Sequence, residues 1–454
     1  MKKITFRTFI CLLIAMFLVI GTGFFLFKYV TSGDDWISFA ANQHLYTDGM
    51  LNKGQVLDVK GDTLINTNEG NWKYNESSTI RKATLHAAGD PDGMIGTGAV
   101  SVFANKITGY NFITGAKTTF AGGRNLYLTI DSDVCAAAYS AMGGHNGTVG
   151  VYNYETGEIV CMVSAPTYDP KNPPTITDDN EYKGAYINNL ISATFIPGST
   201  FKLVTAAAAI DNISDVETRT FKCNGSVMIG NDKVTCTSAH GNISFGEALT
   251  VSCNCTFGQL AVELGADTMD EYVEMIGLTD SYSINGLETA PSTFDFHTDD
   301  NKLAWSGVGQ GNDMVNPCAL MVYAGAIAND GKAAVPQIIS KVKTSGNIRT
   351  SIYLKKSTGQ LLDENTANTL KDMMKDNVKN NYGSGNFPGL DVGAKSGTAQ
   401  ADNKTENNAL FVGFCDDSDH PYAFVVYLEG GNSGSQTAGR VASKVLQAVI
   451  NAED

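Results

Sequence analysis

The chain has little positive charge. Its 32 lysines and arginines are outnumbered by 47 aspartates and glutamates, so the formal net charge is -15 at pH 7. The cations gather only at the N-terminus, in Lys2, Lys3 and Arg7. Because binding to nucleic-acid phosphates needs clustered lysine and arginine side chains, we expect no nucleic-acid partner.

Metal-ligand patterns are also missing. The nine cysteines include no Cys-x-x-Cys pair, and the six histidines are scattered along the chain. Cys253 and Cys255 lie two residues apart, which on a helix is a poor spacing for chelating one zinc ion. The sequence therefore predicts no metal site and no cofactor. An odd number of cysteines also leaves at least one thiol without an intramolecular partner.

A long apolar segment follows the basic N-terminus. Residues 9–27 carry no charge, and a run of about 20 apolar residues can span a bilayer. The residues after Phe27 contain no small-residue cleavage site typical of a signal peptide, which favours an uncleaved anchor. Because flanking cations stay in the cytoplasm, we expect a single-pass protein of the cell membrane, with residues 1–8 cytoplasmic and the acidic bulk outside.

Two cysteines outside this segment are candidates for a disulfide. Cys223 and Cys236 flank residues 224–235, whose pattern is typical of a hairpin. A disulfide closing so short a loop would stabilise the fold by about 3 kcal/mol. The alternative is two independent reduced thiols, and the sequence leaves both open.

The rest of the chain divides in two. Residues 31–122 are rich in Gly, Asn, Thr and Asp with short β-like runs, which indicates a small β-containing domain ending at Gly122-Gly123. Residues 123–454 are more regular. Strand patterns occur early and late in this part, with helical patterns between them and at the end. These predict an α+β fold, an antiparallel sheet covered by helices, and the strands and last helix are expected at residues 148–152, 158–163, 409–414, 422–428 and 437–452.

Three short strings carry chemistry: Ser199-Thr-Phe-Lys202, Ser252-Cys-Asn254 and Lys395-Ser-Gly-Thr398. Any one of them can arise by chance, as Ser340-Lys-Val-Lys343 shows. That copy lies in a β-type run, where residues three apart face opposite ways. Ser199 instead opens a helix-prone run, so Lys202 lies one turn away on the same face.

Serine needs a base to become a nucleophile, and Lys202 is the candidate for Ser199. A lysine acts as a base only when burial or a nearby cation lowers its pKa, and Lys395 can supply that charge. Free backbone N–H groups at the helix start would favour an oxyanion.

The other two strings suggest supporting roles. Ser252 could relay a proton to the leaving group, and Asn254 could hydrogen-bond a substrate amide; sharing one site requires a turn or helix start there. Gly397 would let a substrate backbone pair with the strand that carries Ser396. Lys395 and Thr398 would attract a terminal carboxylate, and the N–H of Thr398 could complete the oxyanion hole.

With all three strings in this order, the chain resembles a class B penicillin-binding protein over nearly its whole length. Further matches occur at residues 53–61, 164–170, 309–311 and 316–317. Lys53, Val59 and Lys60 depart from the family's usual arginine and Asp-Arg. The resemblance implies the penicillin-binding and serine β-lactamase-like transpeptidase fold for residues 123–454, and a pedestal or dimerisation-like domain for residues 31–122.

The resemblance also implies a function. A D,D-transpeptidase would acylate Ser199 with the D-Ala-D-Ala end of a peptidoglycan stem peptide, release D-Ala, and transfer the acyl group to an amine of a second stem. β-Lactams would trap the same serine. With no room for a glycan polymerase, the chain is expected to act beside a polytopic membrane glycosyltransferase.

Other classes fit less well. A class A β-lactamase would need a Glu-x-x-Leu-Asn motif between Asn254 and Lys395, and a class A penicillin-binding protein would need a glycosyltransferase domain; neither is present. A Ser-His-Asp hydrolase would carry Gly-x-Ser-x-Gly around Ser199. A non-catalytic β-lactam sensor or envelope scaffold is the alternative from a different class.

Overall fold

The computed structural model describes residues 2–32, 46–47, 50–51, 54–68, 72–108, 123–400 and 406–453. Much of the stretch expected as the 31–122 domain, including Lys53 and Gly122, lies outside the described residues. The α-helices of six or more residues are α1 (Lys2–Ser32), α2 (Ser78–Ala83), α6 (Ser132–Ala141), α8 (Lys202–Asn212), α9 (Phe245–Thr250), α10 (Asn254–Leu264), α11 (Ala266–Met275), α12 (Asp300–Val308), α13 (Pro317–Ala328), α14 (Glu364–Asn377) and α15 (Gly439–Glu453).

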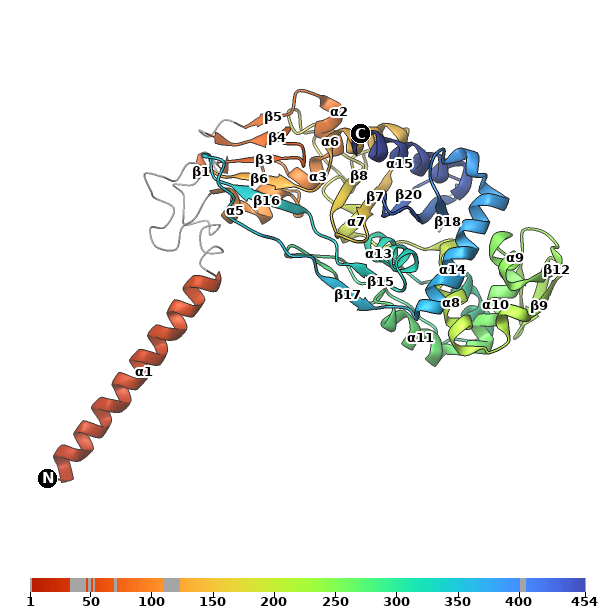
Figure 1. The fold of residues 1–454 in the computed structure, drawn as a ribbon, viewed down its shortest axis with the longest axis horizontal. Helices are drawn as coiled ribbons and strands as arrows, with labels where there is room; N and C mark the ends of the chain where they lie inside the picture. The colour runs from red at the N-terminus through yellow and green to blue at the C-terminus, as the bar shows by residue number, and fades with distance from the viewer. Residues whose placement is uncertain are drawn as a thin grey trace.

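Helix α1 stands apart from the folded body in Figure 1. Its stretch Phe6–Lys28 has a mean hydropathy of 2.7 and none of it is buried. By length and composition this helix can cross a membrane, which fits the single-pass anchor expected at residues 9–27.

A five-stranded antiparallel sheet forms the centre, in the order β18-β19-β20-β7-β8. Its strands are β7 (Gly147–Asn153), β8 (Ile159–Ala165), β18 (Val392–Ala399), β19 (Asn408–Cys415) and β20 (Tyr422–Leu428). Every residue of β19 and β20 is buried, because helices cover both faces of the sheet. The expected α+β fold is confirmed, as are the predicted strands and the last helix.

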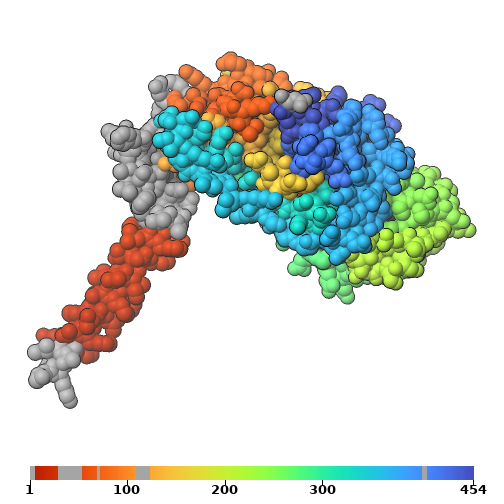
Figure 2. Space-filling view, viewed as in Figure 1, coloured from red at the N-terminus to blue at the C-terminus, as the bar shows by residue number. Residues whose placement is uncertain are grey.

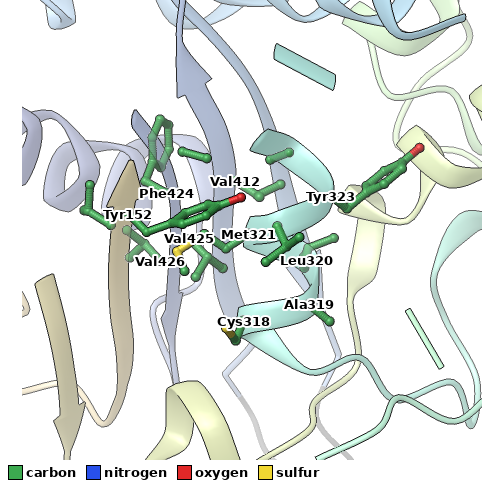
Figure 3. Packing of buried hydrophobic residues seen from close by; sticks show 14 of the residues in the cluster. Tyr152, Cys318, Ala319, Leu320, Met321, Tyr323, Val412, Phe424, Val425 and Val426 are labelled. Atoms are coloured by element: carbon green, nitrogen blue, oxygen red, sulfur yellow. The ribbon is translucent and has the colours of Figure 1, made fainter. Parts of the chain in front are cut away.

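Side-chain alternation assigns the covering helices to opposite faces. Gly150 of β7 faces Met321 of α13, whereas Phe411 of β19 lies against Gly439 at the start of α15. Figure 3 shows Leu320 and Met321 packed toward Val412 and the neighbouring strands. The sheet is therefore a rigid, two-sided support, and β18 forms one of its edges.

A second five-stranded sheet has the order β16-β6-β3-β4-β5. Its strands are β3 (Gln55–Leu57), β4 (Thr63–Asn66), β5 (Lys73–Tyr74), β6 (Asn125–Leu128) and β16 (Ile339–Lys343). Strand β6 pairs in parallel with β3 and antiparallel with β16. The sheet thus combines strands from both sides of residue 122. It also holds the chance pair Ser340 and Lys343.

A third region, drawn in green in Figures 1 and 2, contains helices α8–α11 and two small strand pairs. Residues 224–235 form most of the β10–β11 hairpin, as their pattern predicts, and β9 pairs with β12 around it. The strands are β9 (Thr220–Cys223), β10 (Ser226–Ile229), β11 (Asp232–Thr235) and β12 (Gly241–Ser244).

Candidate active site

The three sequence strings meet at one cleft. Ser199 lies in the short 3-10 turn Gly198–Thr200 just before α8, Ser252 lies between α9 and α10, and Lys395 lies on β18. The cleft has a volume of about 990 Å³. Its lining includes Ser199, Ser252, Asn254, Gln310, Ser396 and Thr398.

The turn that carries Ser199 depends on two glycines. Gly198 has a φ of +56°, a conformation that suits glycine, and a Cβ there would lie 2.9 Å from Thr398 O. A Cβ on Gly397 would lie 2.9 Å from Pro197 O. The missing side chain of Gly397 therefore lets β18 pack against the turn that carries the nucleophile, in addition to the room for a substrate backbone that the sequence predicts.

Lys202 is fully buried beneath Ser199. Its Nζ lies 3.0 Å from Ser199 Oγ and 2.9 Å from Ser252 Oγ. It also donates to two pure acceptors, Ser252 O at 2.7 Å and Asn254 Oδ1 at 2.7 Å. Burial, and then the charge of Lys395, hold the pKa of Lys202 well below its ordinary 10.5.

These hydrogen bonds favour a role for Lys202 as a proton acceptor. A neutral amine has two N–H donors and one lone pair. The carbonyl oxygen of Ser252 and the amide oxygen of Asn254 take both donors, so the lone pair remains for a hydroxyl hydrogen. Lys202 can therefore accept a proton from Ser199.

Lys395 is the second buried lysine. Its Nζ lies 3.1 Å from Ser252 Oγ and 2.9 Å from Ser396 O. Burial lowers its pKa from 10.5 to about 7. The Ser252 hydroxyl thus lies between two amines, where it can pass a proton on.

A strained turn brings Ser252 and Asn254 to the same site. Ser252 has a φ of +55°, which is uncommon for a residue with a side chain. Asn254 then begins α10, and its Nδ2 donates to Thr235 O at 2.9 Å. The prediction of a turn or helix start here is confirmed. Asn254 Oδ1 accepts from Lys202 Nζ, and one Nδ2 hydrogen is donated to Thr235 O. The second Nδ2 hydrogen remains for a substrate carbonyl.

The outer edge of β18 faces the cleft. The N–H of Ser396 donates to Tyr382 Oη at 2.8 Å, and the carbonyl of Thr398 accepts from Gln310 Nε2 at 3.2 Å. Backbone groups two residues apart point the same way along a strand. The N–H of Thr398 is therefore directed to this edge as well.

Sequence reasoning missed Tyr382 and Asn377. Tyr382 Oη donates to Ser396 Oγ at 2.8 Å and accepts from Asn377 Nδ2 at 3.0 Å. Both lie at the end of α14 and beyond it, with no motif to mark them. Asn377 Nδ2 also donates to Ala394 O at 2.9 Å, so these two residues hold the start of the Lys395 string.

The cysteine expectations need correction. All nine cysteines are unbonded, so of the two alternatives left open for Cys223 and Cys236 the structure shows the reduced thiols. Instead, Cys223, Cys236, His240 and Cys253 place their ligand atoms within 4.8 Å of one another. The expectation of no metal-ligand cluster is therefore wrong, because turns bring together residues that the sequence separates.

These features define a class of serine acyl-transfer enzyme in which a buried lysine takes the place of the usual histidine base. Comparison with known proteins agrees. The family model of the penicillin-binding protein transpeptidase domain matches residues 147–451. The peptidoglycan D,D-transpeptidase PbpA of Mycolicibacterium smegmatis is 29% identical over 357 residues, which cover 73% of this chain and 72% of that protein.

Two solved structures are similar. The D,D-transpeptidase domain of a peptidoglycan glycosyltransferase from Eggerthella lenta has a TM-score of 0.75 at 25% identity, covering 88% of this chain and 98% of that one. Penicillin-binding protein A of Mycobacterium tuberculosis, solved as a ceftriaxone acyl-enzyme complex, has a TM-score of 0.73 at 23% identity, covering 87% and 98%. The chain belongs to the penicillin-binding protein transpeptidase family, in its class B.

Proposed function

We propose that the protein is a peptidoglycan D,D-transpeptidase whose acyl-enzyme forms on Ser199. The observation that carries the proposal is the buried Lys202 amine, 3.0 Å from Ser199 Oγ and 2.9 Å from Ser252 Oγ in an open cleft. Family membership supports the reaction class. The substrate is the D-Ala-D-Ala end of a stem peptide, and β-lactams take its place as inhibitors.

In acylation, Ser199 Oγ attacks the carbonyl carbon of the penultimate D-Ala while Lys202 Nζ takes the hydroxyl proton. The carbonyl oxygen becomes an oxyanion. The N–H groups of Ser199 and Thr398 receive it, the first at a helix start and the second on the strand edge.

Collapse of this intermediate breaks the C–N bond and releases D-Ala. The leaving nitrogen needs a proton, and Lys202 supplies it through the Ser252 hydroxyl, which lies 2.9 Å from Lys202 Nζ and 3.1 Å from Lys395 Nζ. An amine of a second stem peptide then attacks the acyl-enzyme by the reverse path, with its proton passing back to Lys202.

The donor peptide binds as an added strand along β18. The protonated fraction of Lys395 and the exposed Thr398 hydroxyl attract the terminal carboxylate. Asn254 offers its remaining Nδ2 hydrogen to a backbone carbonyl of the peptide. Ser396 and Gly397 form the strand edge on which the peptide lies.

The membrane segment supports a proposed orientation and a proposed partner. Lys2, Lys3 and Arg7 favour a cytoplasmic N-terminus, which leaves residues after the anchor outside the cell. A polytopic glycosyltransferase beside the chain would supply nascent strands, since tethering raises their effective concentration. Its contacts would involve residues 9–27 and the part of the chain before residue 122.

The test uses the full chain in detergent, with a pentapeptide donor and an amine acceptor. We expect D-Ala release and a donor–acceptor product, both lost in Ser199→Ala and retained in Ser340→Ala. Penicillin labelling without any transfer to amine or water would instead identify a β-lactam sensor and contradict the proposal.

A further inference from the structure

Four side chains converge behind the turn that carries Ser252. Cys223 ends β9, Cys236 follows β11, His240 precedes β12, and Cys253 caps the start of α10. Their ligand atoms all lie within 4.8 Å of one another. Cys223 and Cys253 are buried, while Cys236 and His240 are partly exposed, which leaves an entry path from solvent.

The spacing matches one metal ion better than a disulfide. Cys236 Sγ lies 3.9 Å from Cys253 Sγ and 3.6 Å from His240 Nδ1. In a tetrahedral zinc site, the Zn–S and Zn–N bond lengths place two sulfurs about 3.8 Å apart and a sulfur and a nitrogen about 3.6 Å apart. A disulfide would require the sulfurs to approach to about 2.05 Å.

We propose that Cys223, Cys236, His240 and Cys253 bind one zinc ion in a closed, tetrahedral Cys3His site. Three thiolates and an imidazole are the ligand set of structural zinc, and four protein ligands leave no position for substrate. One contact orients a ligand: the backbone N–H of Asn254 donates to Cys236 Sγ at 3.2 Å.

The ion would position catalytic groups without touching substrate. Cys253 lies between Ser252 and Asn254, whose side chains contact Lys202. Thr235, next to the ligand Cys236, accepts from Asn254 Nδ2. Zinc would therefore link the β9–β12 and β10–β11 strand pairs to the turn at Ser252. The φ of +55° at Ser252 is a strained conformation, which persists only when the surrounding structure stabilises it. This positioning role rests on the proposed function, whereas zinc binding does not.

Metal content tests binding directly. Full-length protein purified in detergent without chelators should carry about one zinc per chain by elemental mass spectrometry. Cys236→Ser and His240→Ala should lose it. Cys318→Ala is the matched control, since this buried cysteine lies on α13 and is not among the four ligands, and it should keep the metal.

Two further measurements remain decisive if a variant fails to fold. Cobalt exchanged into the wild-type protein should give thiolate-to-metal absorption and tetrahedral visible bands. A wild-type chain without bound metal, or non-reducing peptide mapping that finds a disulfide within the four residues, would overturn the proposal. Loss of zinc from Cys318→Ala alone would overturn the ligand set.

The positioning role has its own readout. Removing zinc should lower the rate of penicillin acylation of Ser199 by about tenfold or more, and added zinc should restore it. The circular dichroism of the rest of the fold should not change. An unchanged acylation rate in metal-free protein would overturn the positioning role, and it would leave the transpeptidase assignment untouched because that is tested by amine transfer.

Discussion

At the scale of single residues, the account depends on Lys202. Its amine has two pure acceptors, Ser252 O and Asn254 Oδ1, so a neutral lysine turns its lone pair to a serine hydroxyl. Lys202→Ala should slow penicillin acylation of Ser199 by at least ~10²-fold, the usual cost of losing a general base. Stopped-flow labelling with a fluorescent penicillin measures the rate. Lys343→Ala, from the chance Ser-x-x-Lys string, is the control and should react like the wild type.

The two lysines also set a pH dependence. Acylation rises with pH as Lys202 loses its proton, and its lowered pKa moves this rise well below pH 10.5. Lys395 has a pKa of about 7, so its charge is present below that pH and is lost above it. The ratio between the acylation rates of a carboxylate-bearing β-lactam and of its methyl ester, in which the contribution of Lys202 cancels, should therefore fall as pH increases through about 7. A ratio that stays constant up to pH 9 would show that the Lys395 charge does not bind the carboxylate.

Tyr382 offers a test of the β18 edge. Its hydroxyl bonds both the N–H and the Oγ of Ser396, so Tyr382→Phe leaves these groups without their partner. We expect a loss of about 1–3 kcal/mol in the free energy of unfolding. Tyr74→Phe is the matched control, because the buried Tyr74 hydroxyl has no hydrogen-bond partner among the described residues. Equal effects of the two changes in chemical denaturation would contradict this reading.

At the scale of elements, the nucleophile's turn and β18 act as one unit. Gly397→Ala would place a Cβ 2.9 Å from Pro197 O and 3.0 Å from Thr200 Cγ2. The strand must then move from the turn, and a displacement of about 1 Å can cost 10²-fold in rate. We expect penicillin acylation to fall at least tenfold. Gly385→Ala, where a Cβ meets nothing within 4 Å, should not change it.

The sequence predicts those secondary-structure elements that are specified by local patterns. The β7–β8 hairpin, β19, β20 and α15 carry their own periodicity and turn signals. The β16-β6-β3 order could not be read, because it joins residues near 55, 125 and 339 without any local pattern. The cysteine cluster was missed for the same reason: its ligands come from separate turns, and Cys-x-x-Cys spacing is not needed when tertiary contacts set the distances.

At the scale of the whole molecule, α1 is exposed along its apolar stretch, and a Cβ on Gly21 or Gly23 would meet nothing within 4 Å. Small residues let another membrane helix approach closely. Replacing residues 9–27 with an unrelated membrane helix should reduce co-purification with a polytopic glycosyltransferase and lower cell-wall cross-linking. Penicillin labelling of the swapped protein should stay unchanged. Unaltered co-purification would mean that the native segment only tethers the chain.

The central claim is that a stem peptide acylates Ser199. The most direct measurement is mass spectrometry of the full chain mixed with a pentapeptide donor, quenched in acid and digested. The account predicts one adduct per chain, the donor minus its terminal D-Ala, on the peptide that contains Ser199. An adduct on Ser340, or no adduct while D-Ala is still released, would contradict it.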